Sequence, residues 1–231
     1  MEDPALAIAL YAVFVFSVTF HEAAHAFVAM RGGDLTAYHG GQVSLSPLPH
    51  MRREPFGMVV LPLLSVLISG WPFGYASAPY DPQWADAHPR RAAWMALAGP
   101  AANLLLVLVA AVSIRGALAA GLFQAPESVL FSRVVSSDVS PLAESSALLL
   151  SVLFSMNLLL AVLNLIPVPP LDGAGALPLL LSNETGQRFR DLGQGAFAWF
   201  GILIAWQVID VIYEPIFLAV VNLLHPDVHY G

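Results

Sequence analysis

Two histidines and a glutamate lie close together inside an apolar stretch of the chain. His21, Glu22 and His25 form the pattern His-Glu-x-x-His. On a helix, positions i and i+4 lie one turn apart on the same face. Both imidazoles can therefore bind one Zn²⁺, while Glu22 takes a proton from water at the metal. The alternative is a pair of helix-end histidines at the membrane interface with Glu22 in water. The apolar surroundings favour the metal site, because ionisable groups in hydrocarbon are costly and usually functional.

A catalytic zinc ion usually has three protein ligands and one open position. The chain has no cysteine, so the third ligand must be a histidine, an aspartate or a glutamate. The other histidines lie in predicted loops or near the C-terminus, whereas Asp172 is the one carboxylate between residues 147 and 182. Pro169, Pro170 and Gly173 would break a helix here and present the carboxylate from a bend. The spacing leaves two interpretations open, a third metal ligand or an N-cap of the following helix.

The composition is that of a membrane protein. Hydrophobic residues make up 58% of the chain and charged residues 11%, and the mean hydropathy is +0.72. A soluble domain has about 25% charged residues, and a soluble enzyme of this composition would expose large apolar patches. The nine basic residues are all arginines, against sixteen acidic residues, for a net charge of −7. They form no basic cluster, so we expect no nucleic-acid partner.

The elements that must position these groups are membrane helices. A spanning helix needs about 20 mostly apolar residues. Hydropathy predicts an all-α polytopic membrane protein with about five to six membrane segments, forming a single domain over residues 1–231. Its catalytic core covers about residues 4–182, followed by C-terminal membrane segments at about 194–225. The clear apolar stretches are residues 4–30, 92–114 and 145–167, and two more, 196–213 and 216–224, are separated by Glu214-Pro215.

Residues 56–76 are apolar but interrupted by proline and glycine. Such a segment is better suited to re-entering the membrane than to crossing it, although a full crossing stays open. Re-entry places seven of the nine arginines on the cytoplasmic side, as the positive-inside bias requires. In the polar stretch before it, residues 42–46 alternate in polarity, which predicts a short β-hairpin or edge strand at the membrane face.

Three motifs, in this order, resemble those of the site-2 protease family of intramembrane zinc metalloproteases (peptidase family M50). They are HEAAH at 21–25, AGPAAN at 98–103 and NLIPVPPLDG at 164–173. The likeness covers about residues 15–180, and the stretches at 55–57 and 70–79 resemble the membrane-dipping segment of the compact branch, which has no PDZ-like or CBS-like module.

By this resemblance, His21, His25 and Asp172 are the ligands of one zinc ion per chain, and Glu22 is the catalytic base. The chain departs from the family in one place. Many relatives continue the last motif as LDGGR, whereas this chain has alanine and glycine after Gly173. Ligand geometry should be unaffected, but helix packing beyond it can differ.

The resemblance also places two asparagines near the substrate or the developing oxyanion. We expect Asn164, eight residues before Asp172, to take part in catalysis and Asn103 to bind substrate. The alternative for both is a hydrogen bond to a neighbouring helix, worth about 0.6–2 kcal/mol in membranes. For Asn103, packing is at least as well supported as catalysis. Asn157 is expected to be structural.

The predicted function is hydrolysis of a peptide bond within or near a transmembrane helix of a membrane-protein substrate. We expect a multi-pass protein of a prokaryotic cell membrane, with its active site nearer the cytoplasmic side and the lipid bilayer as its other partner. The oligomeric state is not predicted. One alternative is a non-catalytic zinc-binding scaffold or a metal permease, against which Glu22 argues. Another is a membrane zincin with glutamate as third ligand, but no glutamate except Glu22 lies in a predicted span.

Overall fold

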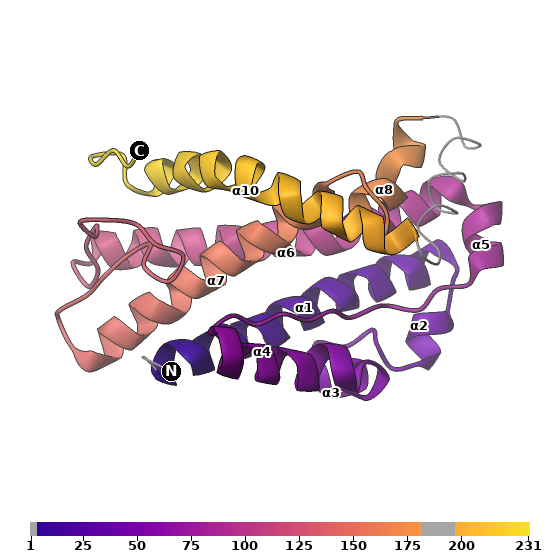
Figure 1. Cartoon of the computed structure of the whole chain (residues 1–231), viewed down its shortest axis with the longest axis horizontal. Coiled ribbons are helices and arrows are strands. Elements are labelled where there is room, and N and C mark those ends of the chain that lie inside the picture. Colours follow the sequence, from indigo (N-terminus) through magenta and orange to yellow (C-terminus); the bar gives the residue numbers. More distant parts are fainter. Residues whose placement is uncertain (1–3, 182–196) are drawn as a thin grey trace.

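The computed structural model describes residues 4–181 and 197–231. Helices α1 (Pro4–Gly32), α6 (Pro89–Ala119) and α7 (Pro141–Leu165) pack against one another, and α10 (Phe197–Leu224) crosses over α7 and α6 (Figure 1). These four are long and apolar enough to span a membrane. The other described helices are short: α2 (Thr36–His39), α3 (Pro47–Arg53), η1 (Phe56–Val60), α4 (Leu61–Ser69), α5 (Pro82–Ala87), α8 (Asp172–Ala176) and η2 (Leu177–Leu179).

Helix starts follow local sequence signals. The Ser140 side chain caps α7 by accepting a hydrogen bond from the Ala143 amide, and Pro141 takes the first helical position, where its missing N–H is not needed. Small residues then allow close packing, since Ala26 on α1 and Ala93 on α6 are fully buried. In a membrane such small residues let helix backbones approach one another.

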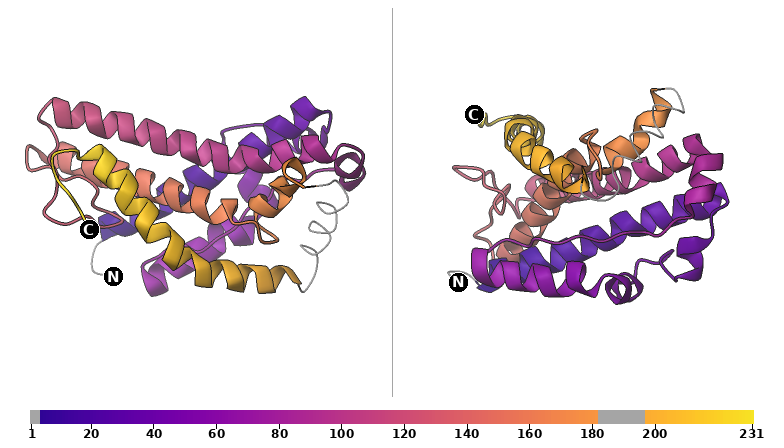
Figure 2. Two further views of the ribbon diagram at one scale, coloured as in Figure 1. Left: turned by 90° about the horizontal axis from the view of Figure 1, so that it is seen from above. Right: turned by 45° about the vertical axis from the view of Figure 1, so that its right-hand side comes forward.

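The expected number of membrane segments is not confirmed, because the C-terminal apolar stretch is one helix and not two. Helix α10 continues through Glu214-Pro215, with Pro215 inside it. Proline removes one backbone hydrogen bond and bends a helix, but does not have to end it, and Figure 2 shows α10 bending along its length. The described part of the chain thus has four candidate spans. The expected start of the C-terminal region at about 194, and two of the arginines used for orientation (188 and 190), lie outside the described residues.

The segment expected to re-enter the membrane folds back on itself. Helices η1 and α4 form a continuous apolar helix that ends at Gly70, whose φ of 73° lies in the left-handed region. Residues 71–80 then run without helix back along α1 (Figure 1). The Ser77 hydroxyl donates to Oε1 of Glu54 at 2.7 Å, so the two ends of the segment meet. This is the geometry that re-entry requires, and the depth of the segment in a bilayer stays a prediction.

The expected β-hairpin at 42–46 is not confirmed. These residues are irregular, and the β-bridges of the described residues are two isolated ones elsewhere, Gln124 with Ser136 and Leu130 with Arg133. The serines of the alternating stretch make local contacts instead. Ser46, for example, caps α3 by accepting from the Leu48 amide. Such side-chain contacts compete with strand pairing.

Polar contacts hold the returning segment in place beside α1. Gln42 Nε2 donates to the Ser77 carbonyl at 3.2 Å, and the Asp81 amide donates to Oδ2 of the buried Asp34 at 2.9 Å. Burial alone would raise the pKa of the Asp34 carboxyl, but the Thr36 hydroxyl and amide and the Asp81 amide, all donors, hold that pKa below its usual value. The extended residues between these anchors form one wall of the site described next.

Candidate active site

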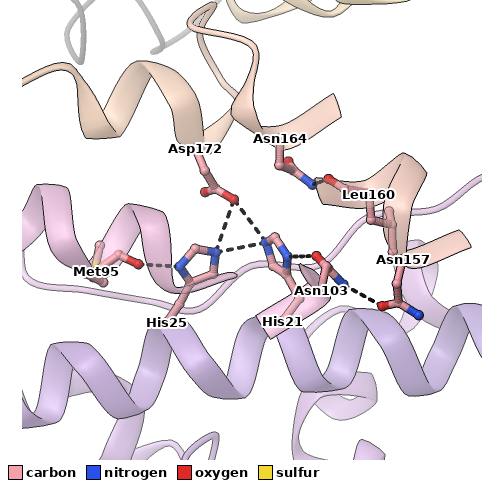
Figure 3. Close-up of polar contacts among 8 residues, drawn as sticks. All are labelled: His21, His25, Met95, Asn103, Asn157, Leu160, Asn164 and Asp172. Atoms are coloured by element: carbon pink, nitrogen blue, oxygen red, sulfur yellow. Dashed lines mark hydrogen bonds and ion pairs between the residues drawn. The ribbon is translucent and has the colours of Figure 1, made fainter. Parts of the chain in front are cut away.

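The three residues predicted as metal ligands meet at one point. His21 and His25 project from α1, and Asp172 is the first residue of α8 (Figure 3). The Nε2 atoms of the two histidines lie 2.9 Å apart. Oδ2 of Asp172 lies 3.0 Å from Nε2 of His21 and 3.3 Å from Nε2 of His25. Both histidines are buried. The structure therefore brings together groups that are far apart in the sequence.

The second nitrogen of each imidazole is held by an oxygen atom. Nδ1 of His25 lies 2.7 Å from the carbonyl oxygen of Met95, and Nδ1 of His21 lies 2.6 Å from Oδ1 of Asn103 (Figure 3). A carbonyl oxygen only accepts hydrogen bonds, so each Nδ1 carries a proton, and in a neutral imidazole Nε2 then presents a lone pair. Partners of this kind orient metal-binding histidines and set their tautomer.

The converging donor atoms fit a zinc ion. Two ring nitrogens and a carboxylate oxygen face one another, and the buried Oδ2 of Asp172 has these ring nitrogens as its polar contacts among the described residues. A buried anionic oxygen needs compensation, which a cation between the three atoms would supply. Two imidazole nitrogens and one carboxylate oxygen form a set that zinc takes in catalytic sites, with a further position left open.

Glu22 lies beside this donor set. It is buried, and a carboxylate oxygen of Glu22 lies within 4.8 Å of a ring nitrogen of each histidine. By distance alone, Glu22 can be a ligand or can act on water next to the metal. Oδ2 of Asp172 lies close to both Nε2 atoms, which makes Asp172 the better third ligand and leaves the Glu22 carboxylate free to face the cavity that it lines.

A cavity of about 330 Å³ adjoins the donor set. The extended segment forms one wall through Ala76 and Tyr80, and α6 forms another through Met95. The bend after α7 contributes residues 169–172, which end at Asp172, the predicted third ligand. A molecule in this cavity would therefore contact Glu22 and an extended stretch of backbone at the same time.

Glycines make room for the site. A Cβ at Gly99 on α6 would overlap Nε2 of both His21 and His25. A Cβ at Gly173 would overlap the carbonyl groups of Leu165 and Ile166, so glycine lets the start of α8 lie against the end of α7. The sequence motifs contain both glycines, but their spacing did not show what each one contacts. The Met95 carbonyl was also missed, because a backbone group has no sequence signal.

The two asparagines predicted near the substrate occupy different environments. Asn103 is fully buried, with its side chain on His21 and Asn157. Asn164 is half-buried near Asp172, and its Nδ2 donates to the Leu160 carbonyl at 2.9 Å (Figure 3). The substrate-binding role of Asn103 and the catalytic role of Asn164 stay predictions. The contact between Asn103 and His21 was not expected from the sequence.

Fold and site together define a class of protein. Apolar helices long enough to span a membrane carry two histidines and a glutamate within one turn of α1, completed by an aspartate from a distant bend. This arrangement has the donor types and spacing of a metal site of the zincin type. Residues 9–208 match the family model described as Peptidase family M50. The chain therefore belongs to peptidase family M50, a family of zinc metalloproteases.

Curated relatives carry related names. The chain is 30% identical over 165 residues to "Putative zinc metalloprotease YwhC" of Bacillus subtilis, a match that covers 71% of this chain and 65% of the relative. It is 29% identical over 212 residues to "Putative zinc metalloprotease Rip2" of Mycolicibacterium smegmatis, a match that covers 86% of this chain and 72% of the relative. For "Putative zinc metalloprotease Rip2" of Mycobacterium tuberculosis strain H37Rv the identity is 30% over 190 residues, and the match covers 82% of this chain and 64% of the relative. The matches thus span about two thirds of these relatives. No match to a solved structure was found.

Proposed function

We propose that this protein hydrolyses a peptide bond within or near a transmembrane helix of a membrane-protein substrate. The observation that carries the proposal is the location of the site. His21, Glu22 and His25 are buried within a 29-residue apolar helix, and not in a separate polar domain. A peptidase with its donors in such a helix reaches substrates that are themselves in the bilayer.

The roles of the residues follow from their positions. His21, His25 and Asp172 would hold the zinc ion, which would act as a Lewis acid and lower the pKa of water to about 7. Glu22 accepts the proton of the attacking water and returns it to the nitrogen of the leaving amine. The Met95 carbonyl and Asn103 keep the imidazoles in the orientation that presents Nε2 to the site.

The substrate must lose helical structure at the cleaved bond. In an α-helix each carbonyl is hydrogen-bonded to an amide four residues on, and is not free to react. Substrates with glycine or proline near the cleavage point should therefore be preferred. The cavity supports this idea, because one wall is the extended segment at 76–80, which suits an extended and not a helical peptide.

The arginines support a cytoplasmic position for the site. Arg31 lies in the last turn of α1, and Arg91, at the start of α6, donates from Nη1 to the Gly32 carbonyl at 3.1 Å. Arginine-rich ends of spanning helices face the cytoplasm, and the histidines lie in the half of α1 nearer this end. We propose a prokaryotic cell membrane as the location, in keeping with the bacterial relatives.

The test compares Glu22→Gln with wild type on zinc content and on cleavage in liposomes. The substrates are a membrane helix with a central Gly-Pro pair and an all-leucine helix. Glu22→Gln keeps the side-chain shape and removes the base, so zinc should stay bound while cleavage falls by about 10²–10⁴-fold. Glu144→Gln, at an exposed position in the first turn of α7, is the matched control and should cleave normally.

Three outcomes would count against the proposal. Cleavage at the wild-type rate by a zinc-loaded Glu22→Gln protein would show that Glu22 is not the base. Absence of wild-type cleavage across a varied panel of membrane helices would favour the zinc-binding scaffold. Zinc transport into liposomes without proteolysis would favour the metal permease.

A further inference from the structure

A line of buried polar side chains leads away from the metal site into the packed centre of the helices. Oδ1 of Asn103 lies 2.6 Å from Nδ1 of His21, and Nδ2 of Asn103 donates to Oδ1 of Asn157 at 2.8 Å (Figure 3). Nδ2 of Asn157 in turn donates to Oγ of Ser17 at 2.9 Å. Asn103, Asn157 and Ser17 are fully buried. They come from α6, α7 and α1, so the line connects all three central helices.

The hydrogen bonds in this line have a defined direction. Nδ2 of Asn157 donates not only to Ser17 but also to the Leu153 carbonyl, at 2.8 Å. A carbonyl oxygen only accepts, so the amide nitrogen of Asn157 must face Leu153, and its oxygen must face Asn103. Asn103 must then turn its own nitrogen toward Asn157 and its oxygen toward His21. The Leu153 carbonyl thereby determines, through two amides, that Nδ1 of His21 carries the proton.

The opposite direction would be incompatible with metal binding. If the Asn103 amide were rotated, its nitrogen would face Nδ1 of His21 and the imidazole proton would move to Nε2. Nε2 is the atom that faces Oδ2 of Asp172 at 3.0 Å, and a protonated Nε2 has no lone pair for a metal. His25 needs no such side chain, because the Met95 carbonyl holds its Nδ1 directly.

We propose that Asn157 is a positioning residue for zinc binding, acting through Asn103 to hold His21 with Nε2 directed at the metal. Ser17 and the Leu153 carbonyl fix Asn157 in turn. Asn157 touches neither His21 nor the cavity, and its effect on the metal is exerted through the Asn103 amide. Replacing it with an apolar residue leaves Asn103 free to rotate and leaves its Nδ2 without an acceptor.

The first experiment measures the zinc dissociation constant of the full-length purified protein by competition with a chelator. Asn157→Leu keeps a similar branched shape and removes all three side-chain hydrogen bonds of Asn157. It should weaken zinc binding by about 10–100-fold, the usual range for outer-shell partners. Ser155→Ala is the matched control, since Ser155 is buried on the same helix and its Oγ has no hydrogen-bond partner. Its zinc affinity should equal that of wild type.

A thermodynamic cycle separates positioning from general damage to the fold. If Asn157 acts through Asn103, the double variant Asn103→Leu/Asn157→Leu should bind zinc no more weakly than Asn103→Leu alone, because coupled residues are not additive. Asn103→Asp supplies an acceptor for Nδ1 of His21 in either orientation. In that background Asn157→Leu should not weaken zinc binding further. Additive losses, or an equal loss in the Asn103→Asp background, would overturn the proposal.

A spectroscopic readout reports the His21 tautomer itself. In the zinc-loaded protein with ¹⁵N-labelled histidine, Nδ1 of His21 should show a directly bonded proton, and this signal should be lost or exchange-broadened in Asn157→Leu. An unchanged signal together with unchanged zinc affinity would refute the proposal. If Asn157→Leu does not fold, Asn157→Ala, which leaves room for a water molecule, enters the same cycle. Both readouts concern zinc and not peptide hydrolysis, so their outcome is independent of the proposed substrate.

Discussion

Replacing Gly99 with alanine should disable the metal site through a single methyl group. A Cβ at this position would come closer to Nε2 of His21 and of His25 than real Cβ atoms come to any neighbour, so both rings would have to move by about 1 Å to restore van der Waals contact. Neither ring is free to withdraw, because Nδ1 of each is hydrogen-bonded, to Asn103 and to the Met95 carbonyl. The clash must therefore be relieved by breaking those hydrogen bonds or by separating α1 from α6.

The expected loss is large. A displacement of 1 Å in a catalytic constellation can cost about 10²-fold in rate, and loss of an outer-shell partner costs about 10–100-fold in metal affinity. We expect Gly99→Ala to weaken zinc binding by at least about 10²-fold and to lower proteolytic activity by at least as much. Alanine favours a helix by about 1 kcal/mol over glycine, so the substitution would be stabilising if the clash were absent.

The same helix provides the matched control. A Cβ at Gly116, also within α6, meets nothing within 4 Å. Gly116→Ala should therefore leave zinc affinity unchanged and raise the free energy of unfolding by up to about 1 kcal/mol. The assay is zinc affinity by chelator competition, with thermal unfolding measured on the same samples. Wild-type zinc affinity in Gly99→Ala would refute the reasoning, because the imidazoles would then not lie against this glycine.

Three other expectations concern the ligands and the folded-back segment. Asp172→Asn and His25→Ala should each lose zinc on purification, measured by metal analysis, and full occupancy in both would exclude the ligand assignment. Single cysteines at positions Ser46 and Ser77 should react with an impermeant thiol reagent from the same side of membrane vesicles, because the two ends of the re-entrant segment meet; reaction from opposite sides would rule out re-entry. Gly173→Ala should lower both the melting temperature and the zinc occupancy, since a Cβ there overlaps the carbonyl groups at the end of α7, and normal melting would contradict that packing.

Local patterns in the sequence were sufficient for features that depend on neighbouring residues. The i, i+4 spacing of His21 and His25 placed both imidazoles on one helix face, because helix geometry alone sets that distance. Long apolar stretches identified the candidate spanning helices, since a helix that crosses the bilayer needs about 20 consecutive apolar residues. The fold-back of the segment after Glu54 was also anticipated, from its proline and glycine content.

Local patterns failed where competing interactions decided the outcome. The alternation at 42–46 suggested a strand, but its polar side chains bind nearby backbone groups and no partner strand is available among the described residues. Glu214-Pro215 suggested a break, but the rest of α10 remains helical around the proline. In both cases the local preference of the sequence was weaker than the interactions with the neighbouring residues.

Only the tertiary structure decided which distant groups meet. From spacing alone, Asp172 was as well explained by a helix cap as by a metal ligand. The packing of α8 against α6 and α7 brings its Oδ2 to both rings on α1. The contact of Asn103 with His21 was likewise not visible in the sequence. The Met95 carbonyl and the space at Gly99 have no local signature at all. The physical reason is that hydrogen-bond direction and steric room at a site depend on atoms contributed by several helices, and the relative placement of those helices follows from their packing and not from any one stretch of sequence.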